Sequence, residues 1–187
     1  LAKMEKQIDR LTGLIRDLLD VSKTQAGLLS FNEEPLNIVE LIRERVSEMQ
    51  MTTDHKLECH SPSKVWVRAD RERLGQVLTN LLENAIKYSP EAEKVTVRVT
   101  PKKEQVIISV QDYGIGIAQE FQAELFKRFF RVQSMSSHTF SGLGLGLYIS
   151  AEIIRRLGGR IWVESAEGQG SVFNFELPLL EKAQIPR

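Results

Sequence analysis

The sequence predicts an α+β fold, a two-layer α/β sandwich in which helices cover one face of a mixed β-sheet, preceded by a long N-terminal helix. Three observations support this prediction. Helical and strand patterns are interleaved along the chain, and several strands come in pairs joined by short turns, as hairpins do. The 187 residues are 42% hydrophobic and 27% charged, the composition of a globular chain that builds a core.

The first predicted element is a helix over residues 1–28. Its apolar side chains recur at spacings of three and four, like the seam of a helical bundle, at Leu1, Met4, Ile8, Leu11, Ile15 and Leu18. Such a stripe needs something to cover it. A partner helix or the rest of the chain can do so, and the heptad spacing favours the partner helix.

The middle of the chain predicts a helix that begins after Asn37, where Glu40 completes a capping box. Two short strands and a longer helix are expected next, at residues 55–60, 64–69 and 71–88. Asp70 is the expected N-cap of that longer helix, because its carboxylate can accept from the first backbone N–H groups.

The second half of the chain predicts two hairpins and two helices. The hairpin strands are expected at residues 94–100 with 105–112, and at 160–164 with 171–177. A short helix is expected around residues 118–127. A longer one should start at a glycine-rich stretch and end at Leu157, because Gly158-Gly159 follows.

Charge and composition exclude some functions. The 25 basic and 25 acidic residues give a net charge of zero, which argues against binding nucleic acid through its phosphates. No apolar run has the length of a membrane span. Cys59 is the only cysteine, which excludes an internal disulfide and fits a reducing cytoplasm. The chain begins at Leu1, so we expect an excised fragment whose parent can carry a membrane anchor upstream.

Four polar residues recur on one stripe of the predicted helix 71–88: Asn80, Asn84, Lys87 and Tyr88. An amide oxygen is a suitable hard ligand for Mg²⁺, and an ammonium pairs with phosphate. A solvated helix surface would show the same kind of stripe. The pattern therefore indicates a nucleotide site only together with other motifs.

Asp112 directly follows a predicted strand and begins the sequence Asp112-Tyr-Gly114-Ile-Gly116. A carboxylate at the end of a strand can accept from an exocyclic amine, so adenine is a plausible ligand. The two glycines allow close backbone approach or positive φ. A tight turn without any ligand would look the same.

Gly142, Gly144 and Gly146 alternate with leucines just before a helix. Backbone N–H groups at the positive end of a helix bind phosphate. The spacing is neither that of a Walker A loop nor that of a dinucleotide fingerprint. The polar residues 132–141, which precede the glycines, are a candidate mobile lid.

These segments together resemble the catalytic ATP-binding domain of sensor histidine kinases of two-component systems. The matching segments are Asn80–Ser89 (N box), Asp112–Gly116 and Gly142–Leu147 (glycine boxes), Phe126–Arg131 (F box) and the closing hairpin 158–175. They occur in order between residues 70 and 178. The resemblance implies the Bergerat fold of the GHKL superfamily, which also contains type II topoisomerase, mismatch-repair and heat-shock chaperone ATPases.

The resemblance also implies roles for individual residues. Asn84 would coordinate Mg²⁺ with Asn80 nearby, Lys87 and Arg131 would contact the phosphates of ATP, and these four residues would be the catalytic ones. Tyr88 would lie along the nucleotide, and Asp112 would accept from the adenine amine. The remaining pocket and hinge residues would be Gly114, Gly116, Ile117, Phe129, Gly142, Leu143, Gly144, Leu145, Gly146 and Leu147.

In the ATPase relatives a glutamate occupies the position of Asn80 and activates water. An amide is a poor base, so the resemblance favours phosphoryl transfer over hydrolysis. None of His55, His60 and His138 has the sequence context of the family's phosphorylated histidine. We therefore expect an ATP-dependent protein-histidine kinase domain whose acceptor is absent from this chain.

The same resemblance divides the chain into residues 1–30, the C-terminal helix of the dimerisation and phosphoacceptor domain, and residues 31–187, the ATP-binding catalytic domain. It implies a homodimer through the N-terminal helix, a response-regulator receiver domain as partner, and a cytoplasmic location beneath an inner-membrane anchor in the parent. Three alternatives stay open: an ATPase of the superfamily, a nucleotide-binding scaffold, and a serine kinase of the anti-sigma type.

Overall fold

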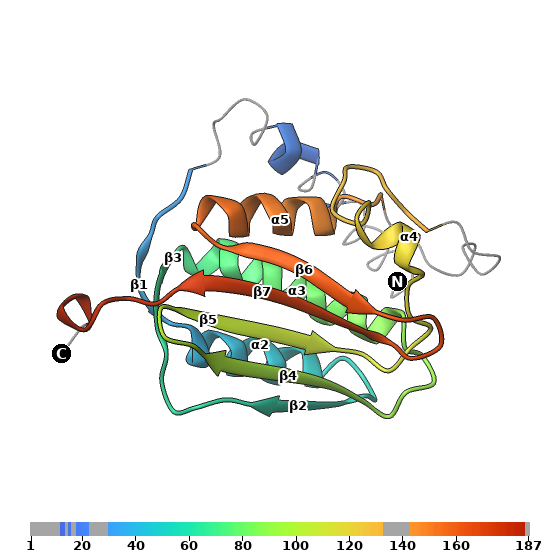
Figure 1. Cartoon of the computed structure of the whole chain (residues 1–187), viewed down its shortest axis with the longest axis horizontal. Coiled ribbons are helices and arrows are strands. Elements are labelled where there is room, and N and C mark those ends of the chain that lie inside the picture. Colours follow the sequence, from blue (N-terminus) through green and yellow to red (C-terminus); the bar gives the residue numbers. More distant parts are fainter. Residues whose placement is uncertain (1–11, 14, 16–17, 23–29, 133–142, 186–187) are drawn as a thin grey trace.

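A five-stranded mixed sheet forms one layer of the molecule, and three helices cover one of its faces (Figure 1). The computed structural model describes residues 12–13, 15, 18–22, 30–132 and 143–185. The strands of this sheet lie in the order β2 (Lys56–His60), β4 (Lys94–Pro101), β5 (Gln105–Gln111), β7 (Ser171–Pro178) and β6 (Arg160–Ser165). The expected two-layer α/β sandwich is confirmed.

Both predicted hairpins are present in the sheet. β4 pairs antiparallel with β5, and β6 pairs antiparallel with β7. β5 and β7 pair antiparallel at the centre, whereas β2 runs parallel to β4 at the edge. The alternating valines that predict β4 are all buried, at Val95, Val97 and Val99. Their side chains face the helices because successive residues of a strand point to opposite faces.

The helices of the second layer are α2 (Ile38–Gln50), α3 (Arg71–Lys87) and α5 (Gly146–Arg156). Asp70 caps α3 as predicted, because its carboxylate accepts from the backbone N–H of Arg73 at 3.0 Å. The core between the layers is made of fully buried side chains, among them Leu74, Leu78, Leu81, Leu82, Ile108, Ile153, Ile154 and Phe175. This packing fixes α3, which carries the predicted polar stripe, against α5.

A separate two-stranded sheet pairs β1 (Glu34–Asn37) with β3 (Trp66–Ala69), and β1 was not predicted. Asn37 precedes α2 as expected, but the predicted capping box is wrong. The Asn37 side chain donates to the Glu40 carboxylate at 2.8 Å and accepts from the backbone N–H of Val65 at 3.2 Å. The strand pairing draws this buried amide towards β3 and away from the helix backbone.

The short helix predicted at residues 118–127 is only α4 (Gln119–Gln122). Beyond it the backbone continues in turns closed between residues three apart, such as Lys127 N–H to the Glu124 carbonyl at 2.9 Å. After β7 the described chain ends with a 3₁₀ turn, η1 (Lys182–Gln184).

Most of the helix predicted over residues 1–28 lies outside the described residues. Residues 12–13, 15 and 18–22 are helical. Ile15, Leu18 and Leu19 are each about half exposed, whereas Asp20 and Val21 are buried. None of the helices among the described residues combines the length and the hydropathy of a membrane span.

Candidate nucleotide-binding site

The polar stripe of α3 lies beside α5. The Asn84 Nδ2 atom donates to Asn80 Oδ1 at 3.4 Å, and Asn80 Nδ2 donates to the Ser150 hydroxyl on α5 at 3.0 Å. This arrangement leaves the Oδ1 atom of Asn84 outside the bond between the two amides, where it can act as an acceptor or a metal ligand. The Lys87 ammonium lies 4.8 Å from the centre of the Tyr88 ring at the end of the stripe.

The N-terminus of α5 approaches this stripe closely because its first residue is a glycine. A β-carbon at Gly146 would overlap the Oδ1 atom of Asn80. The positive end of an 11-residue helix therefore lies next to the two amides. Such an end attracts anions, so the predicted phosphate-binding motif and the predicted amide stripe meet in one place.

Asp112 lies directly after β5 and is only 3% exposed. Its Oδ1 atom accepts from the backbone N–H groups of Gly114 at 2.9 Å and of Ser171 at 3.2 Å. Burial raises the pKa of the Asp112 carboxyl above its usual value of 3.8, and these hydrogen bonds oppose the shift. The carboxylate is thus held in one orientation at the end of the sheet.

The loop after Asp112 packs against the end of α3. A β-carbon at Gly114 would collide with the carbonyl of Tyr88, and the Ile115 N–H donates to that carbonyl at 3.3 Å. Only glycine permits this approach. It places the loop that begins with Asp112 beside the end of the stripe at Lys87 and Tyr88.

Ile117 continues this loop and is fixed by two polar side chains that the sequence did not single out. The Ser165 hydroxyl accepts from the Ile117 N–H at 2.9 Å. The Gln122 amide donates to the carbonyls of Ile117 and Ser165, at 3.0 and 2.8 Å. The loop is therefore anchored to α4 and β6. The local pattern gave no signal for the bonds to Ser165, because Ser165 is distant in sequence from both Ile117 and Gln122.

The F-box segment lies against the second glycine box. The Phe129 N–H donates to the Gly144 carbonyl at 3.0 Å, and both residues have positive φ, 61° and 70°. Positive φ is rare for a bulky aromatic residue, and such strain often marks functional sites. Phe129 is 61% exposed, and the exposed Arg131 follows it. Gly142 and residues 133–141 lie outside the described residues.

The three leucines of the second glycine box have different environments. Leu143 is 44% exposed, Leu147 is partly buried, and Leu145 is 1% exposed and belongs to the core. The side chain of Leu145 thus anchors the start of α5 to the hydrophobic core. Gly116, which also has positive φ, closes the loop on the other side, against residues 166–167.

No group of three or more histidine, cysteine, aspartate or glutamate side chains could hold a metal ion among the residues that the structure describes. The amides of Asn80 and Asn84 nevertheless fit Mg²⁺ that is bound together with a nucleotide. Mg²⁺ keeps several waters and takes its other ligands largely from phosphate oxygens. The available Oδ1 atom of Asn84 would complete such a shell.

A cavity of about 370 Å³ lies elsewhere, between α2 and β2. Its lining residues include Arg43, Met51 and Cys59, and none of them belongs to the predicted nucleotide site. The candidate site at α3 and α5 is therefore indicated by convergent polar groups and not by cavity volume.

Comparisons with known proteins identify the family of the chain. Residues 69–181 match the family described as histidine kinase-, DNA gyrase B-, and HSP90-like ATPase. The chain is 35% identical to the sensor histidine kinase WalK of Bacillus subtilis over 96% of its own length, which is 30% of that relative. It is 37% identical to the adaptive-response sensory kinase SasA of Rippkaea orientalis, over 93% of this chain and 45% of that relative.

Solved structures show the same relationship. Full-length ShkA in complex with AMPPNP has a TM-score of 0.80 and 28% identity, covering 95% of this chain and 38% of that one. The catalytic domain of histidine kinase ThkA has a TM-score of 0.65 and 33% identity, covering 80% of this chain and 96% of that one. The chain therefore belongs to the histidine kinase-, DNA gyrase B-, and HSP90-like ATPase family, and within it to the ATP-binding catalytic domains of sensor histidine kinases. The resemblance seen in the sequence is confirmed.

Proposed function

We propose that this domain binds ATP with Mg²⁺ and transfers the γ-phosphoryl group to a histidine other than His55, His60 and His138. One observation carries the proposal. The close approach of Gly114 to the Tyr88 carbonyl joins the Asp112 loop to the amide stripe of α3, so groups suited to adenine and to phosphate converge. His55 has a structural role, because its Nε2 atom is hydrogen-bonded with the Ser89 carbonyl at 2.8 Å.

At the adenine end, the Asp112 carboxylate accepts a hydrogen bond from the exocyclic amine of adenine. The two backbone N–H groups that bind its Oδ1 atom fix the direction of its remaining lone pairs before the nucleotide arrives. A preformed acceptor loses little freedom on binding. Ile117, held by Gln122 and Ser165, lines the same loop.

At the phosphate end, Lys87, Arg131 and the N-terminus of α5 supply positive potential, and Asn84 holds Mg²⁺ through its Oδ1 atom. Catalysis of phosphoryl transfer relies mainly on positioning and charge neutralisation of this kind. Asn80 is engaged with Ser150 and carries no basic group that could activate water. This favours transfer to an acceptor over hydrolysis.

We further propose that residues 1–30 belong to a dimerisation helix and residues 31–187 to the catalytic domain. The half-exposed Ile15, Leu18 and Leu19 support a partner helix, and hence a homodimer of the parent. Transfer onward to a response-regulator receiver domain, and a cytoplasmic location of the domain beneath an inner-membrane anchor, remain proposals that rest on the relatives, which are longer than this chain.

The experiment is a transfer assay with radiolabelled ATP, Mg²⁺ and the separately produced dimerisation domain of WalK as acceptor. The proposal expects acid-labile label on the acceptor, lost with Asn84→Ala and retained with the exposed control Asp54→Asn. Steady release of inorganic phosphate at the same rate with or without the acceptor, and no label on it, would establish the superfamily ATPase instead.

A further inference from the structure

The helical residues 18–22 present two different faces. Leu18 and Leu19 are 55% and 54% exposed, whereas the next two residues, Asp20 and Val21, are 4% and 6% exposed. Val21 joins the hydrophobic core of the catalytic domain. In Figure 1 this short helix, drawn in dark blue, lies over α5. The face with Asp20 and Val21 therefore packs on the catalytic domain, whereas the face with Leu18 and Leu19 stays exposed.

The docking contact is a buried, charged hydrogen-bond network. Asp20 Oδ2 accepts from Arg73 Nη1 at 3.0 Å and from Gln76 Nε2 at 2.9 Å. The same Arg73 nitrogen also donates to Gln76 Oε1 at 3.1 Å, which fixes the two donors relative to each other. The side chains of Asp20 and Arg73 are only 6% and 19% exposed. Breaking a buried pair leaves an uncompensated charge, so this contact holds one geometry.

The partners of Asp20 lie on the helix that carries the nucleotide site. Arg73, Gln76, Asn80 and Asn84 follow at spacings of three and four, so they share one stripe of α3. At 1.5 Å per residue, Arg73 and Asn84 are about 16 Å apart along the helix axis. The N-terminal helix thus docks at one end of the stripe, and the amides that we assign to Mg²⁺ and phosphate lie towards the other.

Two contacts fix the start of the catalytic domain independently. The Arg156 guanidinium of α5 lies 4.7 Å from the centre of the Phe31 ring, and the Asn32 N–H donates to Asp70 Oδ2 at 2.8 Å. Neither contact holds residues 18–22. Among the described residues of the helix, Asp20 and Val21 are the buried ones, and Asp20 gives the contact with the domain its direction through hydrogen bonds.

We propose that Asp20 is a positioning residue, whose contact with Arg73 and Gln76 holds the N-terminal helix and the catalytic domain in one relative orientation. The exposed Leu18–Leu19 face then keeps a fixed placement with respect to the nucleotide site. If the helix rotated and withdrew Asp20, the largely buried side chain of Arg73 would lose its carboxylate partner. Because that intermediate position is unfavourable, the helix and the domain either move together or separate fully. This inference goes beyond the proposed function and does not require phosphoryl transfer.

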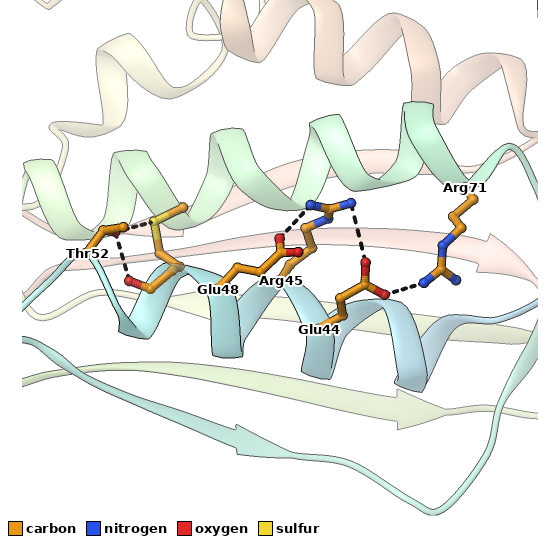
Figure 2. A network of polar contacts seen from close by, with 6 residues as sticks. Glu44, Arg45, Glu48, Thr52 and Arg71 are labelled. Atoms are coloured by element: carbon orange, nitrogen blue, oxygen red, sulfur yellow. Dashed lines mark hydrogen bonds and ion pairs between the residues drawn. The ribbon is translucent and has the colours of Figure 1, made fainter. Parts of the chain in front are cut away.

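A second set of ion pairs reaches α3 but is of a different kind. Figure 2 shows Arg71 of α3 paired with Glu44 of α2, and Arg45 between Glu44 and Glu48. The side chains of Glu44 and Arg71 are 39% and 44% exposed, so solvent screens their attraction. Both partners belong to the catalytic domain. Glu44→Ala is therefore a matched control, because it removes the carboxylate partner of Arg71 on α3 and leaves Asp20 unchanged.

The test is a spin-label distance measurement on the full 1–187 chain. Labels are placed at Leu18→Cys and at Met51→Cys, which is 81% exposed, with Cys59→Ser to remove the native thiol. The proposal expects one narrow distance with Asp20 intact and loss of that single distance with Asp20→Ala or Arg73→Ala. Combining the two should broaden the distance less than the sum of the single effects, because both variants remove the bond between Asp20 and Arg73. Glu44→Ala should keep the narrow distance.

A narrow distance in Asp20→Ala would overturn the proposal, as would equal broadening with Glu44→Ala. Asp20→Asn keeps the shape and one acceptor, so it reports on the contact if the alanine variant folds poorly, and it should broaden the distance less. A merely structural role would lower the urea midpoint and leave the distance unchanged. Titration with AMP-PNP in the same samples is a separate readout, because failure of nucleotide binding would challenge the proposed function and leave the distances untouched.

Discussion

Gly146, the first residue of α5, lies against the side-chain oxygen of Asn80 on α3, so closely that a β-carbon at position 146 would overlap it. This approach brings the positive end of α5 to the amide stripe. The phosphate end of the proposed site depends on it, because a wider gap would move the helix terminus away from the amides.

Gly146→Ala should therefore disturb the site. Overpacking of this kind costs about 1–3 kcal/mol of stability, and AMP-PNP affinity should fall as α5 is pushed from Asn80. Urea unfolding and calorimetric titration measure the two effects. Gly13→Ala is the matched control, since nothing lies within 4 Å of a β-carbon there, and it should be neutral or slightly stabilising. Unchanged affinity in Gly146→Ala would show that α5 does not need this approach.

Ser150→Ala tests the bond that orients Asn80. The hydroxyl is buried and accepts from Asn80 Nδ2 at 3.0 Å, so its loss should cost about 1 kcal/mol of stability. The Asn80 and Asn84 pair should also loosen, and the affinity for AMP-PNP with Mg²⁺ should decrease more than that for AMP-PNP alone. The exposed Ser47→Ala on α2 is the control. Equal decreases with and without Mg²⁺ would argue against a metal role for the pair.

The ionisation of Asp112 gives a pH test of adenine binding. Burial raises the pKa of its carboxyl above 3.8, and the ionised carboxylate accepts a hydrogen bond from the adenine amine more strongly than the protonated acid does. Bound AMP-PNP should therefore lower this pKa. Without nucleotide, the folded state takes up the proton before the unfolded state does, so Asp112 adds stability as the pH falls through its raised pKa. NMR of the Asp112 carboxyl carbon across pH measures its pKa with and without AMP-PNP. A pKa that is the same in both would place adenine elsewhere.

Glu58 should show the opposite pH dependence. Lys56 and Lys94 donate to its carboxylate and lower its pKa to about 2. A depressed pKa contributes stability that is present above the unfolded value of 4.5 and is lost as the pH falls through about 2. The advantage of the native chain over Glu58→Gln in urea should therefore be present at pH 7 and vanish towards pH 2. The exposed Glu91→Gln should show no such convergence.

Local patterns predicted much of the fold and the outline of the site. The helical spacing of Asn80, Asn84 and Lys87 puts them on one face whatever surrounds them, and the strand before Asp112 fixes where its carboxylate emerges. The alternating valines of β4 predict its buried face in the same way. These features depend on neighbours in sequence, so the sequence alone carries them.

Contacts between distant residues were missed. Ser150 and Gln122 look like ordinary polar positions until α3 packs against Ser150 and Ser165 of β6 packs against Gln122. β1 is four residues long and contains Pro35, so its strand pattern is weak. Asp20 lies in a helix that was predicted from its apolar side chains, and its partner Arg73 is 53 residues away. Only tertiary packing reveals such pairs.

The most direct measurement of the central claim is a calorimetric titration of the chain with AMP-PNP and Mg²⁺, repeated on Asp112→Asn and on the exposed control Asp54→Asn. The account predicts saturable binding at one site, kept in Asp54→Asn and lost or strongly weakened in Asp112→Asn. Binding of equal strength in all three would contradict the placement of adenine at Asp112, and no binding by the native chain would contradict the nucleotide site itself.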